Sequence, residues 1–126
     1  MSDIFFSTLA DFGRRLGIPN LTPGANGVVE LKVEKLGRLQ LELDSPGEAV
    51  WLTLARERPA GRDDLSRRLL DLCHWRENHP WAIYPGARGG EWLLLSVRLG
   101  NPEFDLPTLE RLLGYLDNLF TRVEGN

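Results

Sequence analysis

The sequence predicts an α+β protein in which helices pack on an antiparallel sheet, with the elements in the order α-β-β-β-α-β-β-α. Two patterns support this fold class: apolar residues recur at helical spacing near both ends of the chain, and between them apolar and charged residues alternate. Alternation is typical of strands with one buried and one solvated face, which antiparallel sheets commonly have. With 126 residues, the chain has room for one domain, which we expect to span residues 1–126.

The first helix is predicted over residues 3–16. Its apolar stripe consists of Phe5, Leu9, Phe12 and Leu16. Gly17 and Pro19 favour its end, because glycine adopts the left-handed conformation that closes helices and proline does not continue one. Ile4 and Phe6 lie off the stripe, so they either fray at the chain terminus or line a groove for a partner.

Three strands are predicted over residues 29–56, and their apolar positions alternate with polar ones. The positions expected to face the core are Val29, Leu31 and Val33 in the first strand, Leu39, Leu41 and Leu43 in the second, and Val50, Leu52 and Leu54 in the third. Trp51 falls on the opposite face, among charged neighbours. Leu36-Gly37 predicts a tight hairpin, and Ser45-Pro46-Gly47 predicts a type II turn, in which proline presets φ and glycine accepts a positive φ.

The second half of the chain is predicted as a helix, two strands and a final helix. The second helix covers residues 63–77, and the fourth and fifth strands cover residues 81–84 and 91–99. Asp105 is expected to cap the final helix, with Pro107 in its first turn. The wide apolar face of that helix is formed by Leu109, Leu112, Leu113, Leu116, Leu119, Phe120 and Val123.

Composition and charge disfavour several classes of function. The chain is mildly acidic, with 15 lysines and arginines against 18 aspartates and glutamates, whereas nucleic-acid binding usually needs a basic patch. No apolar run approaches the roughly 20 residues of a membrane span, and the N-terminus does not resemble a signal peptide. The single cysteine, Cys73, cannot form an intramolecular disulfide. We therefore expect a cytoplasmic protein that binds no nucleic acid.

The sequence offers no catalytic constellation. Nucleophilic catalysis needs a nucleophile beside an oriented base, yet the only histidines are His74 and His79, near the end of the second helix. Adjacent helical residues do not face each other, and a metal site built on Cys73 and these histidines would lack a fourth ligand. The glycine-rich stretch 86–90 precedes a strand, so it is interpreted as a hairpin turn and not as a phosphate-binding loop. We expect no enzyme activity, no metal and no cofactor.

The last two strands carry apolar side chains on both faces. In the fifth strand, Trp92 and Leu94 lie on one face, and Leu93 and Leu95 lie on the other. When helices cover only one face of a sheet, the second face must be hidden by another part of the chain or by another subunit. Tryptophan is enriched at interfaces, which favours a subunit interface here.

This order of elements in a small acidic chain resembles that of the class I chaperones of bacterial type III secretion, which share the CesT/SycE-like fold. The resemblance covers nearly the whole chain and is strongest to the SycN branch. The similar segments are Leu16-Gly17-Ile18-Pro19, the strands at residues 37–42 and 50–56, and the leucine-rich last helix that begins at Leu106-Pro107. Each segment is only a patterned apolar stretch, so their order and spacing carry the resemblance.

The resemblance implies an ATP-independent, dimeric chaperone in protein transport and virulence, which binds an extended N-terminal segment of a secreted cargo protein. Cargo would bind along the first helix and the first part of the sheet, at Phe5, Phe6, Leu9, Val33, Leu41 and Trp51. The dimer contact would use the second helix and the strands after it, at Leu69, Leu72, Cys73, Trp81, Ile83, Trp92 and Leu94.

The resemblance also suggests partners and a location. Chaperones of the SycN branch pair with a chaperone of the YscB type and serve the YopN-type gatekeeper of the secretion apparatus. We therefore expect either a homodimer or a heterodimer with a YscB-type chaperone, in the bacterial cytoplasm or peripheral at the secretion apparatus. The alternative is a dimeric protein-binding module unrelated to secretion, which would bind a folded partner through the same apolar faces.

Overall fold

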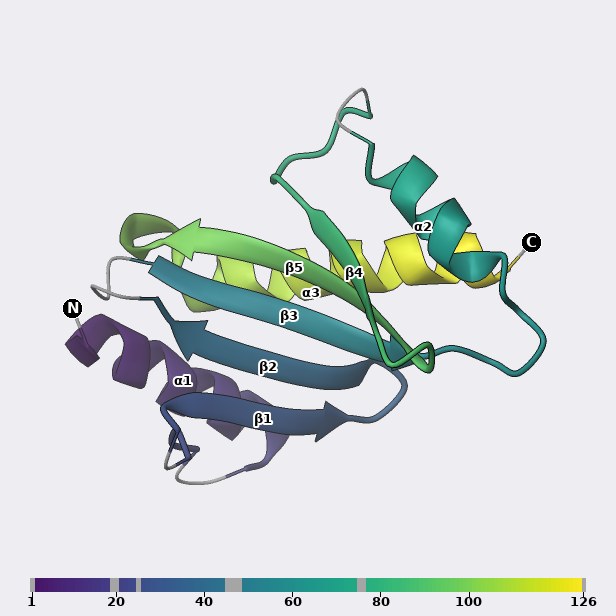
Figure 1. Cartoon of the computed structure of the whole chain (residues 1–126). Helices are drawn as coiled ribbons and strands as arrows, with labels where there is room; N and C mark the ends of the chain where they lie inside the picture. Colours follow the sequence, from purple (N-terminus) through teal and green to yellow (C-terminus); the bar gives the residue numbers. More distant parts are fainter. Residues whose placement is uncertain (1, 19–20, 25, 45–48, 75–76, 126) are drawn as a thin grey trace.

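The computed structural model describes residues 2–18, 21–24, 26–44, 49–74 and 77–125, and the turn predicted at residues 45–47 lies outside them (Figure 1). Within these residues the chain follows the predicted order α-β-β-β-α-β-β-α. The elements are α1 Ser2–Leu16, β1 Val28–Val33, β2 Gly37–Leu43, β3 Ala49–Glu57, α2 Leu65–Leu72, β4 Tyr84–Arg88, β5 Trp92–Gly100 and α3 Leu106–Glu124, with a 3-10 turn at Asn101–Glu103. None of the described helices is long and apolar enough to cross a membrane.

The five strands form an antiparallel sheet in the order β1-β2-β3-β5-β4. Residues paired directly across strands point to the same face, and the pairs Leu39–Leu54 and Leu54–Leu95 align apolar side chains across β2, β3 and β5. The predicted turn between β1 and β2 is present. Gly37 follows it with φ of 128°, and a Cβ there would lie 2.3 Å from the carbonyl oxygen of Ala55, so only glycine fits.

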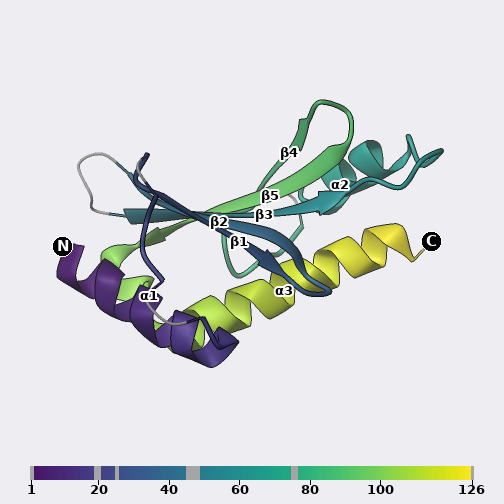
Figure 2. The ribbon, with the colours of Figure 1, turned by 90° about the horizontal axis from the view of Figure 1, so that it is seen from below.

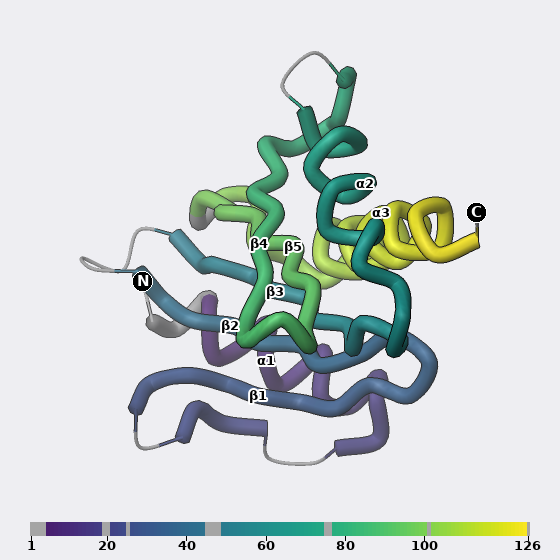
Figure 3. Tube along the Cα trace, turned by 45° about the vertical axis from the view of Figure 1, so that its right-hand side comes forward, coloured from purple at the N-terminus to yellow at the C-terminus, as the bar shows by residue number. Residues whose placement is uncertain are grey.

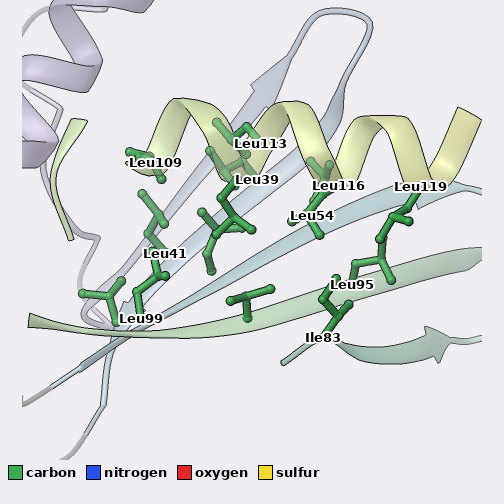
Figure 4. Packing of buried hydrophobic residues seen from close by; sticks show 14 of the residues in the cluster. Leu39, Leu41, Leu54, Ile83, Leu95, Leu99, Leu109, Leu113, Leu116 and Leu119 are labelled. Carbon is green, nitrogen blue, oxygen red and sulfur yellow. The ribbon is translucent and has the colours of Figure 1, made fainter. Parts of the chain in front are cut away.

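Helices α1 and α3 cover one face of this sheet and leave the other open (Figure 2). The buried side chains of α3 are those predicted: Leu109, Leu112, Leu113, Leu116, Leu119, Phe120 and Val123. They pack against inward-facing strand residues such as Leu41, Leu54 and Leu95 (Figure 4). Asp105 caps α3 as predicted. Its carboxylate accepts a hydrogen bond from the backbone N–H of Thr108 at 2.8 Å, and this bond lowers the pKa of Asp105.

Helix α2 is shorter than predicted, because it covers Leu65–Leu72 instead of residues 63–77. At its end, His79 Nε2 donates a hydrogen bond to the carbonyl oxygen of Leu72 at 2.8 Å, which satisfies a carbonyl of the last turn. His79 Nδ1 is also hydrogen-bonded to Tyr115 Oη of α3. The chain after α2 is thus held to α3 by a long-range contact that helical periodicity does not reveal.

Strand β4 lies later than predicted, at Tyr84–Arg88 instead of residues 81–84. Most of the glycine-rich stretch 86–90 therefore belongs to the strand and pairs with β5. The turn is confined to the end of that stretch, where Gly89 and Gly90 have φ of 60° and 73°. A strand that contains both proline and glycine is tolerated here because β4 is at the edge of the sheet.

Arg56 joins β3 to two distant parts of the structure. It lies on the helix-covered face, and its side chain is only 15% exposed. Its guanidinium donates hydrogen bonds of 2.7 and 3.0 Å to the carbonyl oxygen of Leu36, and it forms ion pairs with Asp117 at 2.7 Å and Glu124 at 3.2 Å. It also stacks over the ring of Phe120, 4.7 Å from the centroid. One side chain thus connects the β1–β2 turn to the C-terminal half of α3.

Replacing Arg56 by methionine should lower the free energy of unfolding by about 1–3 kcal/mol, because the apolar stem is kept while a largely buried hydrogen-bonded network is lost. Arg98→Met is the control. Arg98 pairs with Asp44, but its side chain is 48% exposed, so its loss should cost less than about 1 kcal/mol. Urea unfolding measures both variants. Equal effects would contradict the structural role of Arg56.

Candidate functional site

The sheet face that α1 and α3 leave uncovered is called the open face below. Its side chains include Arg38 and Gln40 of β2, Trp51, Thr53 and Ala55 of β3, Tyr84 and Arg88 of β4, and Trp92, Leu94 and Ser96 of β5. The rings of Trp51 and Tyr84 meet edge to face with centroids 5.6 Å apart, and Tyr84 is 54% exposed. An aromatic and apolar area with no helix over it therefore extends from β3 to β4.

A second apolar area surrounds α2, which packs against α3 and β4. Leu70 on the outer side of α2 is 57% exposed, the largest value among the big apolar side chains of the described residues. Leu72, Cys73 and Trp81 are partly buried beside it. The ring of Trp81 packs edge to face on Tyr115 of α3 with centroids 5.8 Å apart, which fixes the chain between α2 and β4. We call Leu70, Leu72, Cys73 and Trp81 the α2 surface.

Two further features are an exposed aromatic on α1 and the sheet edge at β1. Phe6 of α1 is 45% exposed and packs edge to face on Phe5. Strand β1 is the edge of the sheet, and its first residue, Val28, is bonded to the preceding loop through Asn26 Oδ1 at 3.2 Å and Gly24 N at 2.9 Å. From residue 29 to 32, the outer backbone groups of β1 have no partner within the described part of the chain. Such an edge can pair with a further strand.

The family model described as Type III secretory system chaperone SycN matches residues 6–124. The chain belongs to this family of chaperones. The match covers every strand and all but the first residues of α1, so it spans the sheet, the open face and the α2 surface together. No curated protein matches the chaperone in sequence.

Chains from several solved protein complexes share its fold. A chain of the ExsC–ExsE complex aligns with a TM-score of 0.69 and 21% identity, covering 98% of the chaperone and 91% of that chain. A chain from the complex of the Yersinia pestis chaperone SycH with a fragment of YscM2 aligns with a TM-score of 0.68 and 16% identity, covering 94% and 98%. A chain of the HopA1–SchA chaperone–effector complex aligns with a TM-score of 0.65 and 18% identity, covering 99% and 95%.

The residues predicted to bind cargo do not form one surface in the chaperone. Phe5, Leu9 and Leu41 are 1%, 0% and 0% exposed, so their side chains cannot contact a partner and are removed from the predicted site. They belong to the helical stripe and to the inward strand face, which is the pattern that also builds the core. Phe6 and Trp51 remain accessible, but they lie on opposite sides of the sheet.

The residues predicted at the dimer interface are more consistently placed. Leu69 is buried against the core and Ile83 is 8% exposed, so both are corrected to core positions. The remaining five are partly exposed on the α2 surface or the open face: Leu72, Cys73, Trp81, Trp92 and Leu94. The more exposed Leu70 and Tyr84 are absent from the predicted set. The sequence pattern could have identified both as surface residues, since each lies off the face that periodicity assigns to the core.

Cys73 and the two histidines do not form a reactive centre in the structure. Burial raises the pKa of the Cys73 thiol to about 11, so the thiol is protonated at neutral pH and is a weak nucleophile. Both ring nitrogens of His79 are engaged, by Leu72 and Tyr115. Within the described residues, no group of three histidine, cysteine or acidic side chains is placed to hold a metal ion.

Proposed function

We propose that the chaperone binds an extended N-terminal segment of a secreted protein and keeps it unfolded for export, as a dimer and without ATP. The observation that carries this proposal is the edge strand β1, whose outer backbone groups are unpaired from residue 29 to 32 in the described structure, together with the exposed aromatic Phe6 of α1. An extended polypeptide satisfies both, because its backbone can continue the sheet while alternate side chains enter apolar grooves. This kind of binding requires neither a catalytic group nor a nucleotide.

The related complexes support a secreted cargo. The HopA1–SchA structure is described as a chaperone–effector complex, and SycH was solved with a stable fragment of YscM2. Membership of the SycN family favours a YopN-type gatekeeper as the cargo of this chaperone. The chaperone would act in the bacterial cytoplasm, where the cargo is made, or peripherally at the secretion apparatus.

The cargo segment would add to β1 and cross the helix-covered side of the sheet. Val33 is half-buried at the end of β1. It faces the helix-covered side, because it lies two residues after Leu31, which is paired with the inward-facing Leu39. Phe6 lies on the same side in α1. Trp51 belongs to the open face, so it would contact cargo only where the segment wraps around the edge of the sheet. Phe6 is therefore the primary anchor in this proposal.

The dimer would form through the α2 surface and the adjoining part of the open face. These two areas meet at β4, because α2 packs against β4 and Tyr84 lies at the start of that strand. Leu70, Tyr84 and Leu94 would then supply the apolar centre that a stable interface needs. Both a homodimer and a heterodimer with a YscB-type chaperone use the same surface, and native mass distinguishes them.

Phe6→Ala should weaken binding of the N-terminal segment of the gatekeeper from the same secretion system by about 1–3 kcal/mol, which is five-fold to over a hundred-fold, as expected for an aromatic interface residue. Its thermal stability should barely change, because the ring is 45% exposed. The matched control is its neighbour. Phe5→Ala should lower the free energy of unfolding by about 3–5 kcal/mol, because Phe5 is buried and stacked on Phe104.

Isothermal titration and thermal melts separate these outcomes. Trp51→Ala serves as a second test, with a smaller loss of affinity expected because Trp51 lies on the other side of the sheet. Unchanged affinity in Phe6→Ala with a normal melt would remove α1 from the cargo surface. If the chaperone instead prefers the folded gatekeeper to its extended N-terminal segment, it is a binding module of another kind.

The isolated chain should be a dimer at micromolar concentration, with twice the mass of 14.3 kDa, or should be poorly soluble until a YscB-type chaperone is co-expressed. Leu70→Glu and Tyr84→Glu should each shift the dimer to monomer, because a charge would be buried in an apolar interface. Arg111→Glu, an exposed position of α3, should leave the mass unchanged. A soluble, monodisperse monomer of the unmodified chain would contradict the proposed dimer.

A further inference from the structure

The open face contains a hollow of about 260 Å³ that neither cargo binding at the β1 edge and Phe6 nor the proposed dimer surface accounts for. Its lining residues come from the β1–β2 hairpin, from β3 and from the β4–β5 hairpin. Figure 3 shows that the β4–β5 hairpin lies on the other side of the sheet from α1. The walls of the hollow include Glu30 and Lys32 of β1, Arg38 of β2, Arg88 of β4 and Trp92 of β5. An adjoining hollow shares Lys32, Arg38 and Trp92 with it and adds Lys35. Trp92 marks the border with the proposed dimer surface.

Lys32, Arg38 and Arg88 line this hollow, and Lys35 lines the adjoining one. Lys32, Lys35, Arg38 and Arg88 form no ion pair with any residue that the structure describes. This is unusual in a chain with more acids than bases, in which most arginines, such as Arg56, are bound to carboxylates. Glu30 and Glu57 are the only acids among the residues that line the two hollows, so positive charge prevails there.

The cations are placed so that they repel one another. Lys32 and Arg38 are direct partners in the β1–β2 register and point to the same face, an arrangement in which like charges destabilise a sheet. Arg38 is held over the ring of Trp92, 4.9 Å from its centroid, and Arg88 is the register partner of Trp92. An anion seated between these side chains would remove the repulsion and gain charge-assisted hydrogen bonds.

We propose that this hollow binds an acidic stretch of the cargo polypeptide, with carboxylates between Lys32, Arg38 and Arg88 and an apolar side chain against Trp92. A volume of about 260 Å³ is below the roughly 300–1,000 Å³ of small-molecule sites, and it suits two or three side chains of a peptide. A nucleic acid fits less well, because Glu30 lies in the wall and the whole chain has a net charge of −3. This inference rests on the proposed function in one respect only, which is that the acidic polypeptide bound in the hollow belongs to the cargo.

The test uses the purified chain and a fluorescently labelled peptide of alternating glutamate and serine, with the alternating glutamine and serine peptide as its uncharged counterpart. The acidic peptide should bind, more weakly as salt rises, and the uncharged peptide should bind about tenfold less tightly or not at all. Arg38→Glu and Arg88→Glu should each weaken the acidic peptide about tenfold. Arg111→Glu makes the same change of net charge on α3 and should alter the affinity less than about twofold.

Equal affinities for the charged and uncharged peptides would overturn the proposal. So would an equal loss of affinity for the acidic peptide in Arg38→Glu and Arg111→Glu. It would also be overturned if a single-stranded oligonucleotide bound more tightly than the acidic peptide and Arg38→Glu abolished that binding. A second arm measures the gatekeeper segment, extended to include its own acidic residues, at low and high salt. Arg38→Glu should reduce the salt dependence of that affinity, whereas Phe6→Ala should lower the affinity and leave its salt dependence unchanged. A gatekeeper segment that fails to bind the unmodified chain would reject the proposed function while the acidic-peptide result stands.

Discussion

The rest of the structure depends on one constraint, which is that the helices α1 and α3 cover only one of the two faces of the five-stranded sheet. α1 and α3 bury one face, and β5 shows the consequence most clearly. Leu93 and Leu95 are buried on the helix side, whereas Trp92 and Leu94 on the other face stay partly exposed. Exposed apolar areas of this kind commonly mark interaction sites on soluble proteins. This uncovered area is the physical basis of the dimer that we propose.

The polar side chains that might have suggested chemistry serve the architecture. His79 ends α2 and joins it to α3, Asp105 caps α3, and Arg56 links the β1–β2 turn to the same helix. What remains for function is the shape of the surface: an unpaired edge, exposed aromatics, and the cations around Arg38. Such a surface can hold a polypeptide in an extended form with many weak contacts, which is the binding mode that we propose for this chaperone.

The sequence predicted the strands of the first half because their period of two is strict, and the core residues Leu39 and Leu54 follow directly from it. It failed where contacts outside the helical period matter. His79 is hydrogen-bonded both to the last turn of α2 and to Tyr115 of α3, and the second of these contacts cannot be predicted from periodicity. The site was harder than the fold, because Phe5 and Phe6 have the same chemistry and only their angular position on α1 separates core from surface. The cations of the hollow come from β1, β2 and β4, so only the sheet register brings them together.

Hydrogen–deuterium exchange of the chaperone, alone and saturated with the extended N-terminal segment of its cargo, tests the central claim most directly. If an extended segment adds to the edge of the sheet, amides of β1 that face outward in the free protein should exchange much more slowly in the complex, together with alternate amides of the bound segment. Amides of α3, buried in both states, should not change. Protection confined to α2 and β4, with β1 exchanging as fast as in the free chaperone, would contradict the account.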